Sequence, residues 1–430
     1  MTDSTEPAPG SLKELVGHRW YWRWSAAAQA YRLSLIMAPI VFVLVATEQR
    51  GSLALGGVLV AVWTLAPAVV APVAGRVYDR IGVDRWAPRM LVVVAVGLAL
   101  IALGFNAGLA GPLLVALTGI VAAAGAGLAG CNRALLSECV PATLLPVALS
   151  LDASIIELVV ITAPFVAVVT ALIGPVVPVY AMAAITLVSA VLLRSLRAAA
   201  VPATSGNTSD AAVEVRPARS LWRNPRFYFW LMVAAAFGQS VGTLETGAVP
   251  LSDSFEAGSG QAAALIAILG VSSALSGLGY AVISRRLRLG QVSRSSVLMS
   301  IMMVAGIGLG FVDSLGPAIA GYIAVGLCTA PLNTVLFYSV ELEVDPTRRT
   351  EAFSSVSTAS AVGFAVPGAL LALVPLPVTF GISGTFAACA LMFAVVFSRH
   401  RTRAGKSPKV RVETAGAEPA SGRGAWRPLQ

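Results

Sequence analysis

Long apolar stretches separated by short polar segments run through most of the 430-residue chain. Each stretch has roughly the twenty residues that an α-helix needs to cross the hydrocarbon core of a bilayer. The stretches are rich in Ala, Leu, Val and Gly and do not alternate, which favours helices over the strands of a β-barrel. The pattern predicts twelve membrane-spanning helices, at about 25–47, 53–74, 91–109, 112–132, 147–172, 176–194, 227–250, 261–283, 295–313, 316–338, 352–373 and 377–397.

The composition excludes a soluble globular protein. Hydrophobic residues make up 57% of the chain and charged residues only 12%, with a mean hydropathy of +0.81. Soluble domains carry about 25% charged residues, because they need a polar surface. The solvent of most of this chain is therefore lipid. The four cysteines and two histidines show no metal-site spacing, so we predict no metal site and no cofactor.

The longest internal polar segment, 195–226, divides the chain into two sets of six predicted spans. We expect an N-terminal bundle over 25–194 and a C-terminal bundle over 227–397, joined by 195–226 as a flexible linker. Two polar ends flank the bundles, a segment over 1–24 and a basic tail over 398–430, which has the composition of a disordered segment.

The basic residues predict the orientation of the chain. With the N-terminus inside, Arg50 is the only one of the 30 Lys and Arg residues placed outside. Such a bias is typical of inner-membrane proteins. It predicts a multi-pass protein of the inner (plasma) membrane with both termini cytoplasmic. The net charge of +9 follows from this bias and does not indicate a nucleic-acid partner.

The two halves are weak copies of each other. Four pairs of residues recur at a separation of 201 to 207 positions: Arg19 and Arg226, Gly75 and Gly279, Asn132 and Asn333, and Pro164 and Pro367. Internal repeats of this kind are typical of secondary transporters, which bind their cargo near mid-membrane between the two repeats.

The loop after the second span contains a recognisable motif. It reads Gly75-Arg-Val-Tyr-Asp79-Arg80-Ile-Gly82-Val-Asp-Arg85. This resembles the signature loop of the major facilitator superfamily, Gly-x-x-x-Asp-Arg-x-Gly-Arg-Arg, in the same loop of the same half. The resemblance implies an all-α membrane protein with twelve transmembrane helices in two pseudo-symmetric six-helix bundles. It also implies transport by alternating access.

The same resemblance implies a conformational latch. Asp79 would face the N-terminus of the helix that starts near Ala352, where the helix dipole favours a carboxylate. The loop arginines would pair with Glu138, which stands where the family has an acidic residue at the end of the fourth helix. The sequence departs from the motif at Val83, and Arg85, two residues later, is the candidate replacement.

Ionisable residues inside the spans cost several kcal/mol and point to a cavity or a partner. Glu157 shares one face of the fifth span with Ser150 and Ser154, about 15 Å into the helix. We interpret Glu157 as a proton carrier, with a protonated or Arg-paired structural glutamate as the alternative. Asp152 lies on another face of the same helix, where pairing with Arg133 favours a structural role.

The remaining polar candidates leave alternatives open. Arg32 either binds an anionic substrate, neutralises Glu157 or extends to the cytoplasmic interface. Glu245 lies in a polar, glycine-containing part of the seventh span and either lines a cavity or sits at the outer interface. Three amides either line the cavity or tie helices together: Asn132, Asn333 and Gln239.

No Gly-x-x-x-x-Gly-Lys-Ser/Thr loop occurs, so this chain does not draw its energy from ATP. We predict a secondary transporter, not an enzyme, that acts as a monomer and exports a small organic molecule by proton-coupled antiport. The stretch Ile161–Ala167 keeps the proline, Pro164, of a helix-five motif of family exporters but lacks its glycines. The alternatives are metabolite uptake by symport or uniport, and a non-transporting membrane scaffold or sensor.

Overall fold

The computed structural model describes residues 11–200, 221–255, 259–284, 287, 289–371 and 373–404. Within these ranges, twelve helical segments are long and apolar enough to cross a membrane, which confirms the predicted count. Residues 201–220 of the predicted linker and 405–430 of the predicted tail lie outside the described residues, as do residues 1–10.

The first half begins with a short helix, α1 (Leu12–Val16), followed by six spans. The fourth span is divided by a turn in which Gly127 adopts φ +80°, a left-handed conformation that favours glycine. The spans are α2 (Arg19–Arg50), α3 (Leu53–Ile81), α4 (Val83–Asn106), α5 with α6 (Gly111–Ala124 and Leu128–Cys139), α7 (Leu145–Ala171) and α8 (Val177–Ala200).

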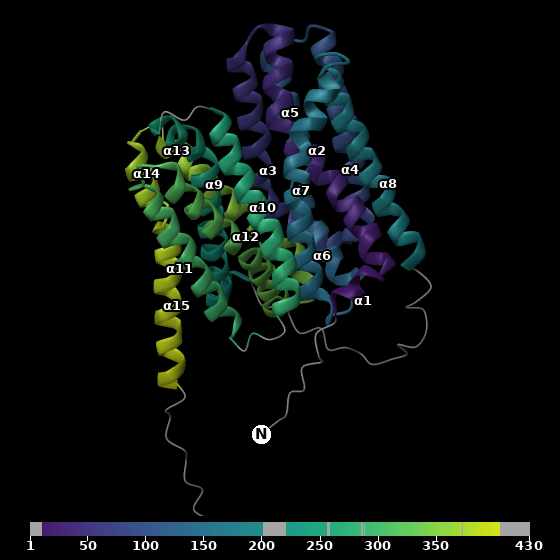
Figure 1. Cartoon of the computed structure of the whole chain (residues 1–430). Coiled ribbons are helices and arrows are strands. Elements are labelled where there is room, and N and C mark those ends of the chain that lie inside the picture. Colours follow the sequence, from purple (N-terminus) through teal and green to yellow (C-terminus); the bar gives the residue numbers. More distant parts are fainter. Residues whose placement is uncertain are drawn as a thin grey trace, which may run out of the picture.

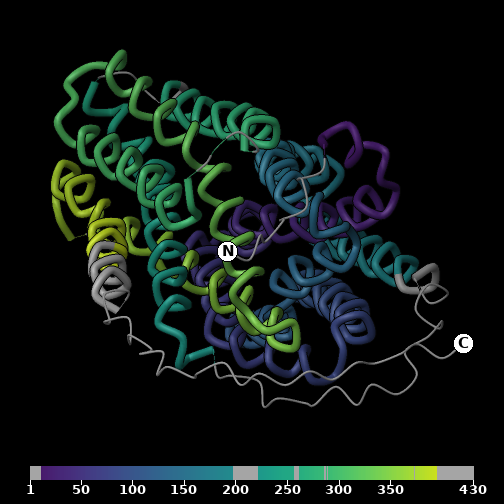
Figure 2. Tube along the Cα trace, turned by 90° about the horizontal axis from the view of Figure 1, so that it is seen from below, coloured from purple at the N-terminus to yellow at the C-terminus, as the bar shows by residue number. Residues whose placement is uncertain are grey.

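The second half repeats this order of six spans. Two short 3-10 helices, η1 (Leu221–Arg223) and η2 (Pro346–Arg348), precede its first and fifth spans. The halves stand side by side in Figure 1, and Figure 2 shows the purple-to-teal and the green-to-yellow helices as two groups seen end-on. The spans are α9 (Pro225–Ser254), α10 (Ser259–Ile283), α11 (Gln291–Leu309), α12 (Leu315–Glu343), α13 (Arg349–Leu371) and α14 with α15 (Leu376–Ile382 and Thr385–Ala404).

Several helices extend beyond the apolar stretches from which they were predicted. α2 begins at Arg19 instead of near residue 25, α8 runs to Ala200, and α15 continues to Ala404, into the predicted tail. A helix does not stop where hydrocarbon gives way to headgroups, because Arg residues continue it with good propensity and Trp residues suit that interface. The Arg19 guanidinium, 5.1 Å from the Trp20 ring centroid, is an example.

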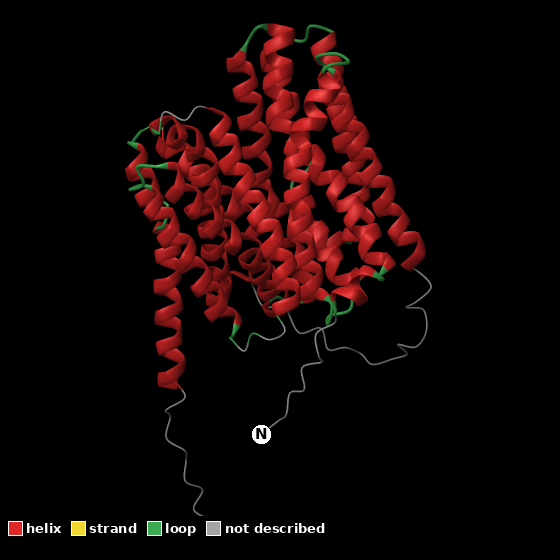
Figure 3. Ribbon diagram, in the orientation of Figure 1, coloured by secondary structure: helices red, strands yellow, loops and turns green. Residues whose placement is uncertain are grey.

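The described residues form helices and loops without any strand (Figure 3). α9 and α12 are the most buried spans. α9 packs closely along α13, where a side chain at Gly238 would collide with the carbonyl oxygen of Ser360 and one at Gly363 with that of Ala235. Small residues that let two helix backbones touch are a common source of attraction between membrane helices, where lipid removes the hydrophobic driving force.

The halves meet along two seams. α3 and α6 of the first half pack against α13, and α7 packs against α10 and α12. We call the end of the bundle where α3 ends and α13 begins the latch face; it is the lower end in Figure 1. The polar contacts between the halves described below run from this face toward mid-span.

Candidate functional site

At the latch face, the carboxylate of Asp79 caps a helix of the other half. Its Oδ1 accepts a hydrogen bond from the backbone N–H of Thr350 at 2.9 Å, and its Oδ2 accepts one from the N–H of Glu351 at 2.8 Å. The first N–H groups of a helix have no partner within it, and the helix dipole favours an anion there. This capping contact therefore joins α3 to the start of α13 only while the two halves are together at this face.

An ion pair that the sequence analysis missed lies beside the cap. Arg76 Nε is 2.5 Å from Glu351 Oε1, and Glu351 Oε2 is 2.7 Å from Arg348 Nη2. Glu351 is only 1% exposed. The helices approach so closely here that a Cβ on Gly75 would lie 2.7 Å from the Glu351 Cα, which explains the glycine of the motif. The motif does not specify the residue at the position of Arg76, so it gave no reason to expect this ion pair. The sequence did offer one signal, an acidic residue at the start of the eleventh span.

The other latch residues are arranged differently from the expectation. Glu138 lies within electrostatic range of Arg349 of α13, whose Nη2 is 2.6 Å from Glu341 Oε1, and no contact with Arg80 or Arg85 is found among the described residues. The reason is that the end of α6 packs against the start of α13. Arg80 and Arg85 are exposed, and Arg85 lines a groove between α4 and α8. Gly82 adopts φ +102° at the junction of α3 and α4, a conformation that favours glycine.

A second cluster of charges is enclosed within the first half. Asp152 is 0% exposed and accepts two hydrogen bonds from Arg32, one from Nη1 at 2.5 Å and one from Nη2 at 3.1 Å. Arg133 Nη1 lies 2.8 Å from Asp152 Oδ2, and Gln29 Nε2 donates to Asp152 Oδ1 at 2.8 Å. Arg32 therefore pairs with Asp152 and not with Glu157, because α2 packs on the face of α7 that carries Asp152.

This cluster touches the second half through Arg133. The Arg133 guanidinium lies 4.2 Å from the ring centroid of Phe337 on α12. Such cation–π contacts stabilise a cation where water is scarce. The cluster therefore belongs to the first half, with one aromatic contact across the boundary.

The stripe of α7 singled out in the sequence faces α10 of the other half. Ser150 Oγ donates to the Gly277 carbonyl at 2.6 Å, and Ser154 Oγ donates to the Ala274 carbonyl at 3.0 Å. One turn further along, Glu157 Oε1 accepts a hydrogen bond from Ser273 Oγ at 2.7 Å. This seam is thus built from hydroxyls and ends at a carboxyl group near the middle of the 27-residue helix.

A second carboxyl group lies near Glu157. Glu245 of α9 interacts electrostatically with Glu157, and both side chains are half-buried. Tyr322 of α12, whose hydroxyl donates to the Leu244 carbonyl at 2.7 Å, lies within electrostatic range of Glu245. The structure therefore brings together two carboxyl groups that the sequence analysis had selected separately.

The three amides have different surroundings. Gln239 is fully buried and ties α9 to α14 and α15, since its Nε2 donates to the Ile382 carbonyl at 3.0 Å. It lies between helices of the second half and does not line the cavity described below. Asn132 is buried, and its backbone carbonyl accepts a hydrogen bond from Trp24 Nε1 at 2.8 Å. Asn333 is partly exposed on α12.

A cavity of about 260 Å³ lies inside the first half and is closed on one side by α13. Its lining is mainly apolar, with Trp63, Pro67 and Val121 among its walls. Hydroxyl groups supply most of its polar side chains: Tyr31, Ser34, Thr64, Thr186, Ser357 and Thr358. Such a lining suits a small organic molecule held by shape and a few hydrogen bonds.

The family profile described as Major Facilitator Superfamily matches residues 25–366. The chain belongs to the major facilitator superfamily. Membership of this family, together with the twelve helical spans in two halves, identifies the protein as a multi-pass membrane transporter and not an enzyme. No curated protein matches this facilitator by sequence.

Several solved structures share the fold of this facilitator. A bacterial homologue of the iron transporter ferroportin, in an outward-facing state, superimposes with a TM-score of 0.68 at 17% identity, over 90% of this chain and 100% of that one. The human organic anion transporter MFSD10 gives 0.64 at 15% identity, over 87% and 97%. FucP, the E. coli fucose:proton symporter, gives 0.63 at 17% identity, over 88% and 99%. At these identities the likeness shows the fold alone.

Proposed function

We propose that this facilitator is a proton-coupled exporter of a small, largely uncharged organic molecule. The proposal rests on Glu157, a half-buried carboxyl group near the middle of a span and at a boundary between the halves. A carboxylate in hydrocarbon is expensive, and such groups in membrane proteins commonly belong to proton or substrate pathways.

The surroundings of Glu157 support proton binding. Its hydrogen-bond donor is the neutral hydroxyl of Ser273, and the nearby Glu245 carries a charge of the same sign. A like charge within electrostatic range disfavours the ionisation of both carboxyl groups at once. Separation of α7 from α10 would remove the Ser273 hydroxyl and admit water to Glu157. Proton release is thereby linked to the movement of one half against the other.

The latch supports alternating access. Asp79, Arg76 and Glu351 join the halves at the latch face, and their contacts must break for that face to open. The distribution of Lys and Arg supports a cytoplasmic location of this face. On this orientation the molecule is in an outward-facing state, with both termini cytoplasmic and the protein in the plasma membrane.

The cavity supports the class of cargo. The hydroxyl and apolar groups around about 260 Å³ favour a small molecule with few charges, since the described residues of that lining include no charged side chain. One of the similar structures is a proton symporter of a sugar and another an organic anion transporter, so both proton coupling and organic cargo occur on this fold. The direction, export, rests on Pro164 of α7, which keeps the proline of the exporter motif where its glycines are lost.

The test begins with a thermal-shift screen of organic compounds on the purified protein, to find a cargo. Flux of that cargo is then measured in proteoliposomes under an imposed pH gradient. Glu157→Gln should lower pH-driven flux at least about a hundredfold, the lower end of what a positioned proton-transfer group contributes, while cargo exchange without a gradient continues. Glu48→Gln changes an exposed carboxyl group at the end of α2 and is the matched control.

Unchanged pH-driven flux in Glu157→Gln would remove this residue from the mechanism. The direction is tested separately in cells that lack the gene. Loss of an exporter raises the intracellular level of the cargo, whereas loss of an uptake system lowers it.

A further inference from the structure

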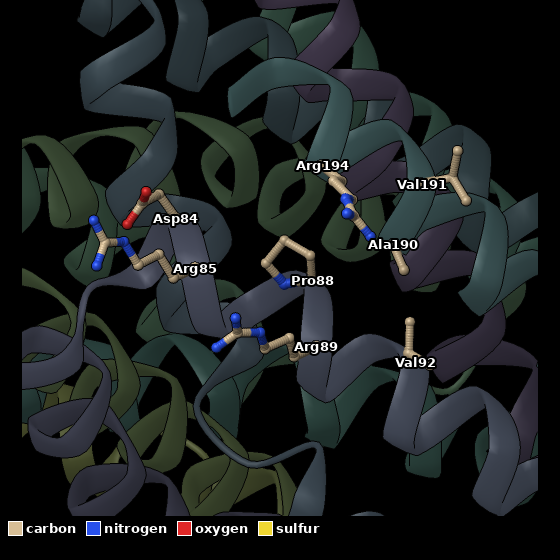
Figure 4. Close-up of a pocket in the computed structure, with 8 residues that line it drawn as sticks. All are labelled: Asp84, Arg85, Pro88, Arg89, Val92, Ala190, Val191 and Arg194. Carbon is tan, nitrogen blue, oxygen red and sulfur yellow. The ribbon is translucent and has the colours of Figure 1, made fainter. Parts of the chain in front are cut away.

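A groove of about 310 Å³ opens between α4 and α8 at the latch face. Figure 4 shows Asp84 and Arg85 on one side of Pro88 and the apolar side chains of α8 and Val92 on the other, with Arg89 and Arg194 between them. The charged residues are Arg85, Arg89 and Arg194 with Asp84, and the apolar residues are Pro88, Val92, Ala190 and Val191.

The groove continues into a lipid-facing apolar track. On α4, Val92, Val96 and Leu100 recur every four residues and are all exposed. On α8, Val191 is 62% exposed, and Val188 is exposed one turn deeper. Arg85 and Arg194 lie near the ends of their helices, whereas the valines lie further into the spans. The surface therefore changes from cationic to apolar along one line, as a phospholipid changes from headgroup to acyl chain.

The charge of the groove favours a phosphate group. The described lining contains three guanidinium groups and one carboxylate, and guanidinium binds phosphate oxygens through paired hydrogen bonds. The Arg89 guanidinium also lies 5.2 Å from the ring centroid of Trp86, an aromatic residue of the kind that gathers at membrane interfaces.

The second half offers an internal comparison. A groove of about 400 Å³ lies at the same end of the bundle, lined by residues of α9, α11, α12 and α15. Its Arg226 lies 3.8 Å from its Glu343, so the two charges offset each other. The two grooves are alike in size and position, but among their described lining residues cations are in excess in the α4–α8 groove and balanced in the other.

We propose that the α4–α8 groove binds the headgroup phosphate of an anionic phospholipid. Arg85, Arg89 and Arg194 hold the phosphate, and an acyl chain lies along the valine track of α4 and α8. Clusters of arginine beside the cytoplasmic leaflet are suited to anionic lipids, and each basic group near the surface contributes to binding. This assigns Arg85, which the family motif places in the latch, to a lipid site.

The experiment uses the full-length protein in phosphatidylcholine nanodiscs containing a photoactivatable phosphatidylglycerol. Labelled peptides are mapped by mass spectrometry, and lipid affinity is measured by native mass spectrometry. The label should concentrate on 83–106 and 177–200. Arg85→Gln/Arg89→Gln/Arg194→Gln should weaken phosphatidylglycerol binding at least about tenfold, given the contribution of each arginine. Arg19→Gln/Arg23→Gln/Arg223→Gln removes the same charge from exposed sites outside the groove and should retain the binding.

A second variant, Ala190→Trp, fills the groove without a change of charge and should also lower the labelling. It keeps the test decisive if the triple variant does not fold. Equal labelling by a photoactivatable phosphatidylcholine would overturn the proposal, as would an equal loss in the control triple variant. Competition by millimolar inorganic phosphate, with no dependence on the acyl chain, would instead show a site for free phosphate and overturn the lipid assignment.

Discussion

Two carboxyl groups on α7, Asp152 and Glu157, stand five residues apart and have opposite environments. Asp152 is fully buried between two guanidinium groups and an amide, all from its own half of the molecule. Glu157 is half-buried, accepts one hydrogen bond from Ser273 of the other half, and has a second carboxyl group nearby. Five residues turn a helix by about 140°, so the two side chains address different neighbours.

These different environments distinguish a structural carboxyl group, Asp152, from Glu157, which we propose takes part in transport. The surroundings of Asp152 are α2, α6 and α7, which belong to one half and move together when the halves rock. Glu157 lies on the seam with α10, so its surroundings change whenever that seam opens. A group whose environment changes with conformation can couple a proton to that change, whereas a permanently paired one cannot.

The largest expected effect is that of Asp152→Asn. The substitution leaves Arg32 and Arg133 buried without their counter-charge, and breaking a buried ion pair from one side typically costs about 3–5 kcal/mol. We expect low yield and a strongly lowered thermal unfolding midpoint in detergent. A loss of stability below about 1 kcal/mol, the range of an exposed pair, would mean that the Asp152 cluster does not hold the first half together.

The fold was predictable because each span can be recognised from its own stretch of sequence. The bilayer fixes the length of a spanning helix and the side on which Lys and Arg gather, and the connections between spans are short. All twelve helices were found from these features. The helical ends were less accurate, as at Arg19 and Ala404, because hydropathy marks the hydrocarbon boundary and not the last turn of helix. The residues of the first-half motif were likewise found by their spacing.

The pairing of charges was harder to predict. The period of α7 placed Ser150, Ser154 and Glu157 on one stripe, since that needs only helix geometry. It did not give the partner of Arg32, because depth in the membrane does not fix which neighbour a side chain faces. Arg76 and Glu351 are 275 residues apart, and only the packing of α3 against α13 brings them together.

Asp79→Asn should have an intermediate effect, on conformation and not on folding. The amide keeps the size of the side chain but loses the charge that faces the N-terminus of α13. Loss of such a cap costs about 0.5–2 kcal/mol, which shifts the ratio of closed to open latch by roughly twofold to thirtyfold. Spin labels at the exposed positions Arg80 and Leu342 should report a larger population of long distances.

Asp345→Asn is the matched control for this measurement. Asp345 accepts hydrogen bonds from the N–H and hydroxyl of Thr347 within the second half, and these bonds lower the pKa of Asp345 below its ordinary value. This cap therefore contributes above the unfolded-state pKa and is lost as pH falls through the folded value. At neutral pH the distance distribution should stay as in the wild type. An equal shift in both variants would mean that the Asp79 cap has no special part in closure.

The smallest effect on stability is expected for Glu157→Gln. Like Asp152→Asn, this substitution replaces a carboxyl group of α7 by an amide, but on the face of the helix that contacts α10. Gln still accepts the hydrogen bond from Ser273, no cation among the described residues is paired with Glu157, and the substitution adds no charge to a poorly solvated site near Glu245. The unfolding free energy should change by less than about 1 kcal/mol, the net value of one neutral hydrogen bond. Denaturant unfolding of both variants in the same detergent gives the comparison directly. If Glu157→Gln destabilised the protein as much as Asp152→Asn does, Glu157 would be a structural residue, and any loss of pH-driven flux in that variant would reflect misfolding instead of a missing proton carrier.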